Sequence, residues 1–327
     1  MLIDPFKRKI NYLRISVTDR CNLRCCYCMA KEGISLISHE EILSYEELVR
    51  IVRVFAEEGI SKVRLTGGEP LVRKGITDFI SRLFRIEGIE DLSLTTNGIL
   101  LKELAQDLKR AGLKRINISL DSLRRERFCQ ITRRDEYERV WEGIEESLRV
   151  GLSPVKINMV AIKGVNDDEI ESFARLTLSL PLTVRYIEYM PSGNGEEWKE
   201  DNIITIPQIQ TRLERVGKLI PIPSDRWDGP AKRFRIEGAL GEIGLIGPVS
   251  SHFCDDCNRL RLTSDGKIRT CLFSDEEIDV KELLRKGGSD HDLKERLLLA
   301  LRMKPERHHI NSSQFKKCQR NMSAIGG

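Results

Sequence analysis

Residues 12–28 read YLRISVTDRCNLRCCYC, so a strand-like run, YLRISV (12–17), leads directly into a loop with four cysteines. Segments with helical periodicity separate this run from five further strand-like runs: KVRLT (62–66), DLSLTT (91–96), KRINISL (114–120), PVKINMV (154–160) and TVRYIEY (183–189). This alternation is typical of parallel βα units with right-handed crossovers. Six strands are two fewer than a complete eightfold barrel has, which leaves an open sheet or a partial barrel. We predict an α/β fold with a partial (β/α)6 TIM-type barrel.

The first helical segment carries clear end signals. In SYEELVRIVRVFAEEG (44–59), Ser44 and Glu47 form a capping box and Gly59 is a natural C-cap. Between them, apolar residues recur on one helical face. We therefore predict a helix that begins after Ser44 and ends before Gly59.

The βα alternation stops after the sixth strand. The segment IPIPSDRWDGPAKRF (220–234) is rich in proline and polar residues and indicates a boundary. Short strand-like pieces, a second cysteine group and a helical run, KERLLLALRM (294–303), follow it. We predict two domains, the barrel at 1–222 and a C-terminal α+β region at 223–327.

Composition narrows the class of protein. The 327 residues hold 54 Lys+Arg and 50 Asp+Glu, a net charge of +4, with 40% hydrophobic residues, which is typical of a globular protein. A charge balance this even argues against a nucleic-acid partner. No apolar run reaches the roughly 20 residues of a membrane span, and MLIDPFKRKI lacks the apolar region of a signal peptide. We expect a cytoplasmic protein without a membrane partner, whose nine cysteines serve metal or redox chemistry.

Chemically distinctive residues follow the predicted strands. The cysteine loop follows the first strand, TGGEP (66–70) the second and TTNG (95–98) the third, while Ser119-Leu120-Asp121 closes the fourth and Met190-Pro191 follows the sixth. The carboxyl ends of parallel strands meet on one face, where such folds build their active sites. We expect these segments to form one site.

The first cysteine group has the spacing C-x3-C-x2-C, from Cys21, Cys25 and Cys28. Three thiolates can hold three irons of a [4Fe–4S] cluster and leave the fourth iron for another ligand. Zinc would need a fourth protein ligand, and no histidine lies nearby in the sequence. We interpret the other cysteines outside the two groups, Cys26, Cys129 and Cys318, as bystanders.

The second group comprises Cys254, Cys257 and Cys271, with His252 two residues before its first cysteine. A Cys3His zinc site and an iron–sulfur cluster fit this spacing equally well.

The first cysteine group, with Tyr27 before its last cysteine, and TGGEP after the second strand resemble the radical S-adenosylmethionine superfamily. Together with CDDCNRLR (254–261), a distant third cysteine and the ending Ile325-Gly326-Gly327, the chain resembles the GTP 3′,8-cyclase family of molybdenum-cofactor biosynthesis over nearly its whole length. One departure is Ala30, where that family usually has proline after Met29. This difference removes none of the predicted cysteine ligands.

The resemblance implies two [4Fe–4S] clusters, the second bound to the guanine base, and S-adenosylmethionine held by Tyr27, Gly68, Ser119 and Met190. It also implies that the tail, Gly326 and Gly327, reaches into the active site. Since no P-loop motif occurs, a triphosphate needs fixed cations, and Arg259 and Arg261 would share one face of an extended strand. The GTP contacts that the resemblance implies are Arg14, Arg64, Thr95, Lys156, Arg259, Leu260 and Arg261.

The implied reaction begins with a 5′-deoxyadenosyl radical that removes the ribose 3′ hydrogen of GTP. Attack of the carbon radical on C8 and a reduction then give (8S)-3′,8-cyclo-7,8-dihydro-GTP, the first intermediate of the molybdenum cofactor. The resemblance further implies an external one-electron reductant and a cyclic pyranopterin monophosphate synthase that takes the product. A homodimer is one assembly that fits the resemblance. Two alternatives stay open: another two-cluster radical enzyme, such as a peptide-modifying one, and a zinc or iron–sulfur binding module without catalysis.

Overall fold

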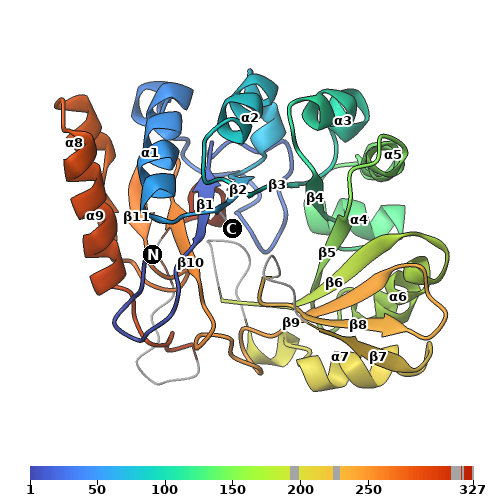
Figure 1. Ribbon diagram of the computed structural model, residues 1–327. Coiled ribbons are helices and arrows are strands. Elements are labelled where there is room, and N and C mark those ends of the chain that lie inside the picture. The colour runs from blue at the N-terminus through green and yellow to red at the C-terminus, as the bar shows by residue number, and fades with distance from the viewer. Residues whose placement is uncertain (192–198, 224–228, 311–317, 319, 326–327) are drawn as a thin grey trace.

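The computed structural model describes residues 1–191, 199–223, 229–310, 318 and 320–325. It confirms the six predicted strands as neighbours, all parallel, in one sheet (Figure 1). Their bounds are β1 Tyr12–Ser16, β2 Lys62–Thr66, β3 Asp91–Thr96, β4 Arg115–Ser119, β5 Val155–Ala161 and β6 Leu182–Glu188. The partial TIM-type barrel is therefore confirmed.

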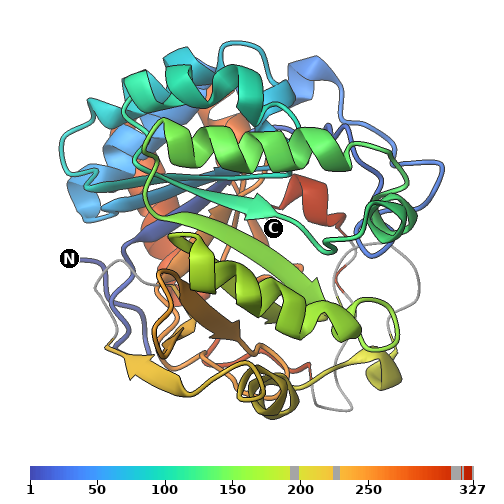
Figure 2. The same ribbon diagram turned by 90° about the vertical axis from the view of Figure 1, so that its right-hand side faces the viewer.

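Helices cover the outer side of the curved sheet (Figures 1 and 2). Their bounds are α1 Tyr45–Glu58, α2 Ile76–Phe84, α3 Leu101–Arg110, α4 Arg125–Thr132, α5 Tyr137–Arg149 and α6 Ile170–Ser179. The capping box of α1 is present, since Ser44 Oγ accepts from Glu47 N and Glu47 Oε2 accepts from Ser44 N. Gly59 ends this helix with φ at 117°, a left-handed conformation that favours glycine.

Strands from the C-terminal third of the chain extend both edges of the sheet. β9 (Glu242–Ile246) pairs in parallel with β6, and β10 (Arg259–Leu262) pairs in parallel with β1. Antiparallel strands complete the two ends: β7 Leu219–Ile222, β8 Lys232–Ile236, β11 Lys267–Arg269 and β12 Glu277–Asp279. The division into domains at residue 222 stays a prediction.

Three further helices follow β6 in the sequence: α7 Ile206–Leu213, α8 Lys281–Arg285 and α9 Asp290–Arg302. The helix predicted around 294–303 begins four residues earlier, at Asp290. Ser289 and Asp292 form a capping box that fixes this start. α9 packs beside α1 on the outside of the sheet. None of the helices in the described part of the chain is both long and apolar enough to cross a membrane.

Side chains alternate strictly along the strands. On the helix-covered face they are apolar and buried, for example Leu13 and Ile15 on β1 or Val63 and Leu65 on β2, and they form the core. On the inner face of β1 and β2 they are polar or charged, as the positions between these residues show: Tyr12, Arg14 and Ser16 on β1, and Lys62, Arg64 and Thr66 on β2. Apolar side chains from β5, β6 and β9 also line the cavity on this face: Val160, Ile187 and Ile246. The fold therefore places polar chemistry on the concave side of the sheet.

Candidate active site

A cavity of about 320 Å3 lies on the concave side of the sheet, and both cysteine groups line it. Cys21, Cys25 and Cys28 come from the loop after β1. The second group joins them from segments far away in the sequence, as Cys254, Cys257 and Cys271. The loops that follow the strands therefore form one site, as predicted, and the two sets of three cysteines line the same cavity.

The bystander cysteines do not line this cavity. Cys26 sits in the loop itself, where its backbone N donates to Ile131 O. Cys129 Sγ lies 3.3 Å from Asp135 Oδ1 at the surface, and Cys318 Sγ lies 2.9 Å from Nη2 of the buried Arg269. The cavity thus separates the six predicted ligand cysteines from the other three.

The TGGEP segment is packed tightly against the first cysteine loop. Gly68 N donates to Thr18 O over 2.7 Å, and a Cβ built on Gly68 would stand 2.3 Å from Arg20 O. Only glycine fits such an approach of two backbones. Glu69, which is 1% exposed, accepts hydrogen bonds from Leu71 N, Thr96 Oγ1 and Asn97 N. One carboxylate therefore ties the loop after β2 to the loop after β3.

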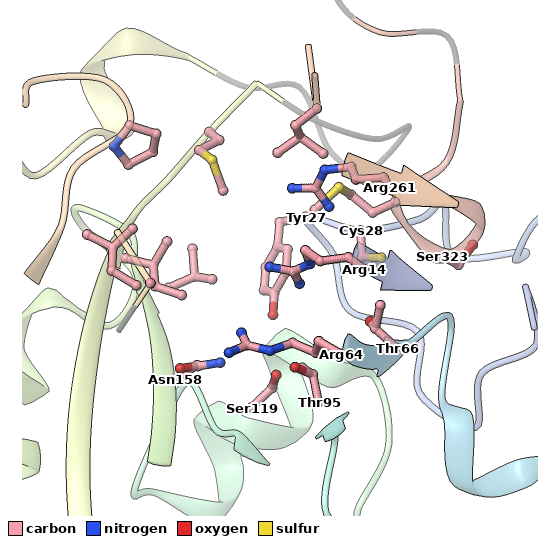
Figure 3. Close-up of a pocket in the computed structure, with 18 of the residues that line it drawn as sticks. Arg14, Tyr27, Cys28, Arg64, Thr66, Thr95, Ser119, Asn158, Arg261 and Ser323 are labelled. Atoms are coloured by element: carbon pink, nitrogen blue, oxygen red, sulfur yellow. The ribbon is translucent and has the colours of Figure 1, made fainter. Parts of the chain in front are cut away.

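All four residues predicted to hold S-adenosylmethionine line the cavity: Tyr27, Gly68, Ser119 and Met190. Tyr27 Oη donates to Asp121 Oδ2 over 2.6 Å, so its side chain is engaged by the protein. In Figure 3, Tyr27 and Cys28 lie beside Arg14, on the side of the cavity near the first cysteine loop. These positions fit a cofactor bound next to that loop.

Four predicted arginines line the cavity from neighbouring strands, and Figure 3 shows three of them, Arg14, Arg64 and Arg261, projecting into it. Arg14 on β1 lies at the same register level as Arg64 on β2 and Arg261 on β10. Arg259 shares the inner face of β10 with Arg261, as expected for an extended strand. Like charges directly opposite each other on paired strands are destabilising. This row of cations therefore suits a polyanionic ligand.

Two of the predicted GTP contacts do not line the cavity. Leu260 lies on β10 between Arg259 and Arg261, and its side chain is fully buried in the core. Lys156 lies two residues before the cavity-lining Asn158 on β5, so it shares the inner face one layer deeper in the barrel. Thr95 does line the cavity. Gly326 and Gly327 lie outside the described residues.

Sequence reasoning missed further polar residues of the cavity wall. Tyr12, Asn158 and Arg185 line it from β1, β5 and β6. Five buried oxygens of the wall have no hydrogen-bond partner within the described protein: Tyr12 Oη, Thr95 Oγ1, Asn158 Oδ1, Thr270 Oγ1 and Ser323 Oγ. Such atoms are costly unless a ligand or water satisfies them. The alternation of polar and apolar residues in the first part of these strands, as in Lys156-Ile157-Asn158 on β5 and Thr183-Val184-Arg185 on β6, was the signal that could have found them.

The charge of the wall is strongly positive. Of the described residues that line the cavity, five are arginines, and Asp121 is the one carboxylate. Burial acts to raise the pKa of Tyr12, but Arg64, Arg14 and other cations lower it to about 8. Burial, with Arg259 nearby, lowers the pKa of Arg261 to about 10. The cavity therefore favours negative charge.

The two cysteine groups differ in their electrostatics. Burial raises the pKa of Cys21 to about 11 and that of Cys28 to about 12. Burial acts in the same direction on Cys257, but Arg259 and Lys304 lower the pKa of that thiol to about 6. The second group therefore has a thiolate stabilised by the protein itself.

The spacing of the thiols bears on the metal. Within the described residues, no three His, Cys, Asp or Glu side chains are arranged to hold a single metal ion. A zinc ion with bonds of about 2.3 Å requires its sulfurs close together, whereas a four-iron cluster holds them further apart. His252, the rival zinc ligand, has Nδ1 at 3.0 Å from Pro248 O and 3.2 Å from His308 Nε2. The histidine that a Cys3His zinc site would need is therefore already in contact with two other protein groups.

Comparisons with known proteins agree with this site. Residues 15–177 match the radical SAM superfamily, and residues 182–310 match the family described as Molybdenum Cofactor Synthesis C. The chain is 51% identical over 326 residues to a GTP 3′,8-cyclase of Thermodesulfovibrio yellowstonii, covering 99% of each chain. It is 50% identical over 327 residues to that of Heliobacterium modesticaldum, covering 100% of each chain.

A solved structure shares the fold. Streptococcus suis SuiB superposes with a TM-score of 0.60 over 95% of this chain and 78% of that chain, at 17% sequence identity. The fold, the first cysteine group and the matched region define this protein as a member of the radical S-adenosylmethionine superfamily, which uses a [4Fe–4S] cluster and S-adenosylmethionine. Within that superfamily, the chain belongs to the GTP 3′,8-cyclase family.

Proposed function

We propose that this protein cyclises GTP to (8S)-3′,8-cyclo-7,8-dihydro-GTP in the cavity between its two cysteine groups. S-adenosylmethionine binds beside Cys21, Cys25 and Cys28, and GTP lies between it and the second group. The observation that carries the proposal is the row of Arg261, Arg14 and Arg64 across β10, β1 and β2, between the two sets of thiols. This row offers planar, bidentate donors to a triphosphate.

A [4Fe–4S] cluster at the first cysteine group, when bound, supplies the electron that cleaves S-adenosylmethionine to methionine and a 5′-deoxyadenosyl radical. The residues of the chain position the reactants. Tyr27, Gly68, Ser119 and Met190 line the cofactor side, and the arginines fix the phosphates at the other end of the nucleotide. The buried walls of the barrel keep water away from a reactive species.

The second cysteine group holds a second [4Fe–4S] cluster in this proposal, next to the guanine base. One feature favours a cluster over zinc: His252, the histidine that a Cys3His site would need, contacts Pro248 and His308. The thiols of Cys254, Cys257 and Cys271 line the same cavity as the arginines. A base held there lies within reach of both groups.

Assembly and cellular context complete the proposal. The enzyme takes one electron at a time from an external reductant and works in the cytoplasm. It acts as a homodimer and passes its product to a cyclic pyranopterin monophosphate synthase. The alternative of a peptide substrate has support only from a shared fold, because the solved SuiB bound to its precursor peptide is 17% identical to this chain.

The test is an anaerobic assay of the reconstituted protein with S-adenosylmethionine, a one-electron reductant and GTP. The expected result is a cyclised guanine nucleotide, with 5′-deoxyadenosine formed in step with it. A Cys21→Ser variant serves as the matched control and should form neither product. Formation of 5′-deoxyadenosine that does not respond to GTP, with no cyclised nucleotide, would overturn the proposal.

A further inference from the structure

Lys304 is a buried cation outside the reaction cavity. It follows α9 and is 3% exposed. Its Nζ donates to Thr270 O over 2.8 Å and to Arg259 O over 2.9 Å, and it lies 3.5 Å from Cys257 Sγ. Thr270 precedes Cys271, and Arg259 follows Cys257 by two residues. One ammonium group therefore joins the backbones beside two of the three cysteines.

The charge of Lys304 has no carboxylate partner. Among the described residues, no Asp or Glu forms an ion pair with it, and its hydrogen bonds go to two carbonyls and a sulfur. The charged groups that act on it are the thiols of Cys257 and Cys271 and the cations Arg259 and Arg8. Burying a cation without a counter-charge is costly. Within the described part of the chain, the negative charge that acts on Lys304 is the one that the sulfurs of Cys257 and Cys271 can carry.

A second buried cation holds the same region from the other side. Arg8, which is 8% exposed, pairs with Asp4 over 2.6 Å and donates to Cys254 O over 2.8 Å. It also donates to Pro305 O and Glu306 O, the carbonyls directly after Lys304. Arg8 therefore holds both the backbone of Cys254, the first cysteine of the second group, and the segment that directly follows Lys304.

We propose that Lys304 is the positioning and charge-compensating residue of the second cysteine group, and that its charge raises the reduction potential of the centre held there. This inference rests on the proposed second cluster. Reduction adds negative charge to a centre, so a fixed cation and a hydrogen bond to a ligand sulfur both favour the reduced state. Lys304 touches neither substrate nor cavity, and acts through Cys257.

The experiment compares three substitutions in the full chain, reconstituted with iron and sulfide. Lys304→Met removes the charge and the donors, Lys304→Gln keeps a neutral donor, and Lys304→Arg keeps the charge. Lys294→Met is the matched control, because Lys294 lies on the surface of α9 in an ion pair with Glu58. The readout is a redox titration of both clusters followed by electron paramagnetic resonance.

The expected result is a lower midpoint potential of the second cluster in Lys304→Met and Lys304→Gln, with the first cluster unchanged. Lys304→Arg should restore the wild-type value, and Lys294→Met should keep it. A merely structural role would let Lys304→Gln restore the value. Equal potentials in the wild type, Lys304→Met and Lys304→Gln would overturn the proposal. If Lys304→Met fails to fold, the comparison of the midpoint potentials of Lys304→Gln and Lys304→Arg with that of the wild type decides the question.

Metal analysis of the wild type separates this inference from the proposed function. Zinc in place of iron at the second group would contradict the second cluster and the effect on its reduction potential, because zinc is not redox-active, but not the positioning and charge-compensating role of Lys304. The deciding measurement is then the rate at which a chelator removes the zinc. Faster loss from Lys304→Gln than from Lys304→Arg supports the role, and equal rates overturn it.

Discussion

Tyr27 and Asp121 join the first cysteine loop to the barrel. Tyr27 Oη donates to Asp121 Oδ2 over 2.6 Å, and Asp121 Oδ1 accepts from Val160 N over 2.8 Å. Because Asp121 follows β4 and Val160 lies in β5, a single carboxylate connects the loop to two strands. The loop that carries Cys28 is therefore fixed by contacts made within the protein itself.

Tyr27→Phe should lower the free energy of unfolding by about 1–3 kcal/mol, because it leaves a buried carboxylate oxygen without its donor. The measurement is urea unfolding of the metal-free protein under anaerobic conditions. Tyr45→Phe is the control, since Tyr45 Oη lies 3.4 Å from Arg73 O and makes a much weaker bond. Equal losses in the two variants would show that the Tyr27–Asp121 bond does not stabilise the loop.

Glu69 should make stability depend on pH. Burial raises its pKa from an ordinary 4.5 to about 7, although its three hydrogen-bond donors act in the opposite direction. The folded state then binds the proton more tightly than the unfolded state. Stability from this group is present below about 4.5 and is lost as the pH rises through 7, by on the order of 3 kcal/mol.

The check is the free energy of unfolding of metal-free protein from pH 4.5 to 8, compared between the wild type and Glu69→Gln. The downward slope should be steeper in the wild type than in the variant, which keeps the smaller contribution of Asp121, whose pKa burial raises to about 6. A wild-type stability that rises over this range relative to Glu69→Gln would mean that the three hydrogen bonds outweigh burial.

Arg64→Ala should weaken GTP binding roughly 10- to 100-fold, the loss expected for a charged hydrogen bond to phosphate. Lys156→Ala should weaken it less, because Lys156 lies one layer below the cavity wall. Both variants should still cleave S-adenosylmethionine slowly without GTP. Arg82→Ala is the control, since Arg82 is exposed and pairs with Glu46. Calorimetric titration that finds the same affinity in Arg64→Ala and Arg82→Ala would remove Arg64 from the site.

The segment before the Gly-Gly tail is anchored beside the cavity. Ser16 Oγ donates to Ser323 O over 3.0 Å, Ser264 N donates to Ala324 O, and Ile325 is fully buried. Arg320 forms a two-point ion pair with Asp265. Met322 and Ser323 line the cavity, and the short helix that contains them lies on the concave side of the sheet (Figure 2). The chain is therefore directed toward the reaction space.

Removing Gly326 and Gly327 alone should leave the free energy of unfolding within about 0.5 kcal/mol of wild type, because Ile325 keeps its place. Cyclisation of GTP should nevertheless stop. Truncation after Ala324 should cost about 2–5 kcal/mol more, since it also removes a buried isoleucine. Thermal unfolding and product analysis check both effects. Full cyclisation by the chain that ends at Ile325 would show that the tail has no role.

Local patterns were enough to predict the barrel. Each of the strands β1 to β6 is a short run with alternating apolar residues and pairs with its neighbour in sequence order, and all but β5 are followed by a loop with distinctive residues. The addition of β9 and β10 at opposite edges was not predictable in this way. It depends on pairings such as that of Tyr12 with Arg259, which local periodicity does not reveal.

For the candidate site, too, the sequence was enough for the residues that belong to motifs but not for the others. The cysteines and motif residues were found because their spacing carries chemistry, whereas Asn158 and Arg185 belong to no motif. Their positions follow from the alternation along β5 and β6 once the polar face is known to point inward. The contact of Lys304 with Cys257 joins residues 47 apart in sequence and needed the folded structure.

The central claim, that two separate clusters face one cavity, is tested most directly by iron and sulfide analysis of three anaerobically reconstituted proteins. These are the wild type, a variant with Cys21, Cys25 and Cys28 replaced by serine, and one with Cys254, Cys257 and Cys271 replaced. The account predicts that each variant holds half the iron and half the sulfide of the wild type. Wild-type iron content in either variant, or zinc in place of iron at the second group, would contradict it.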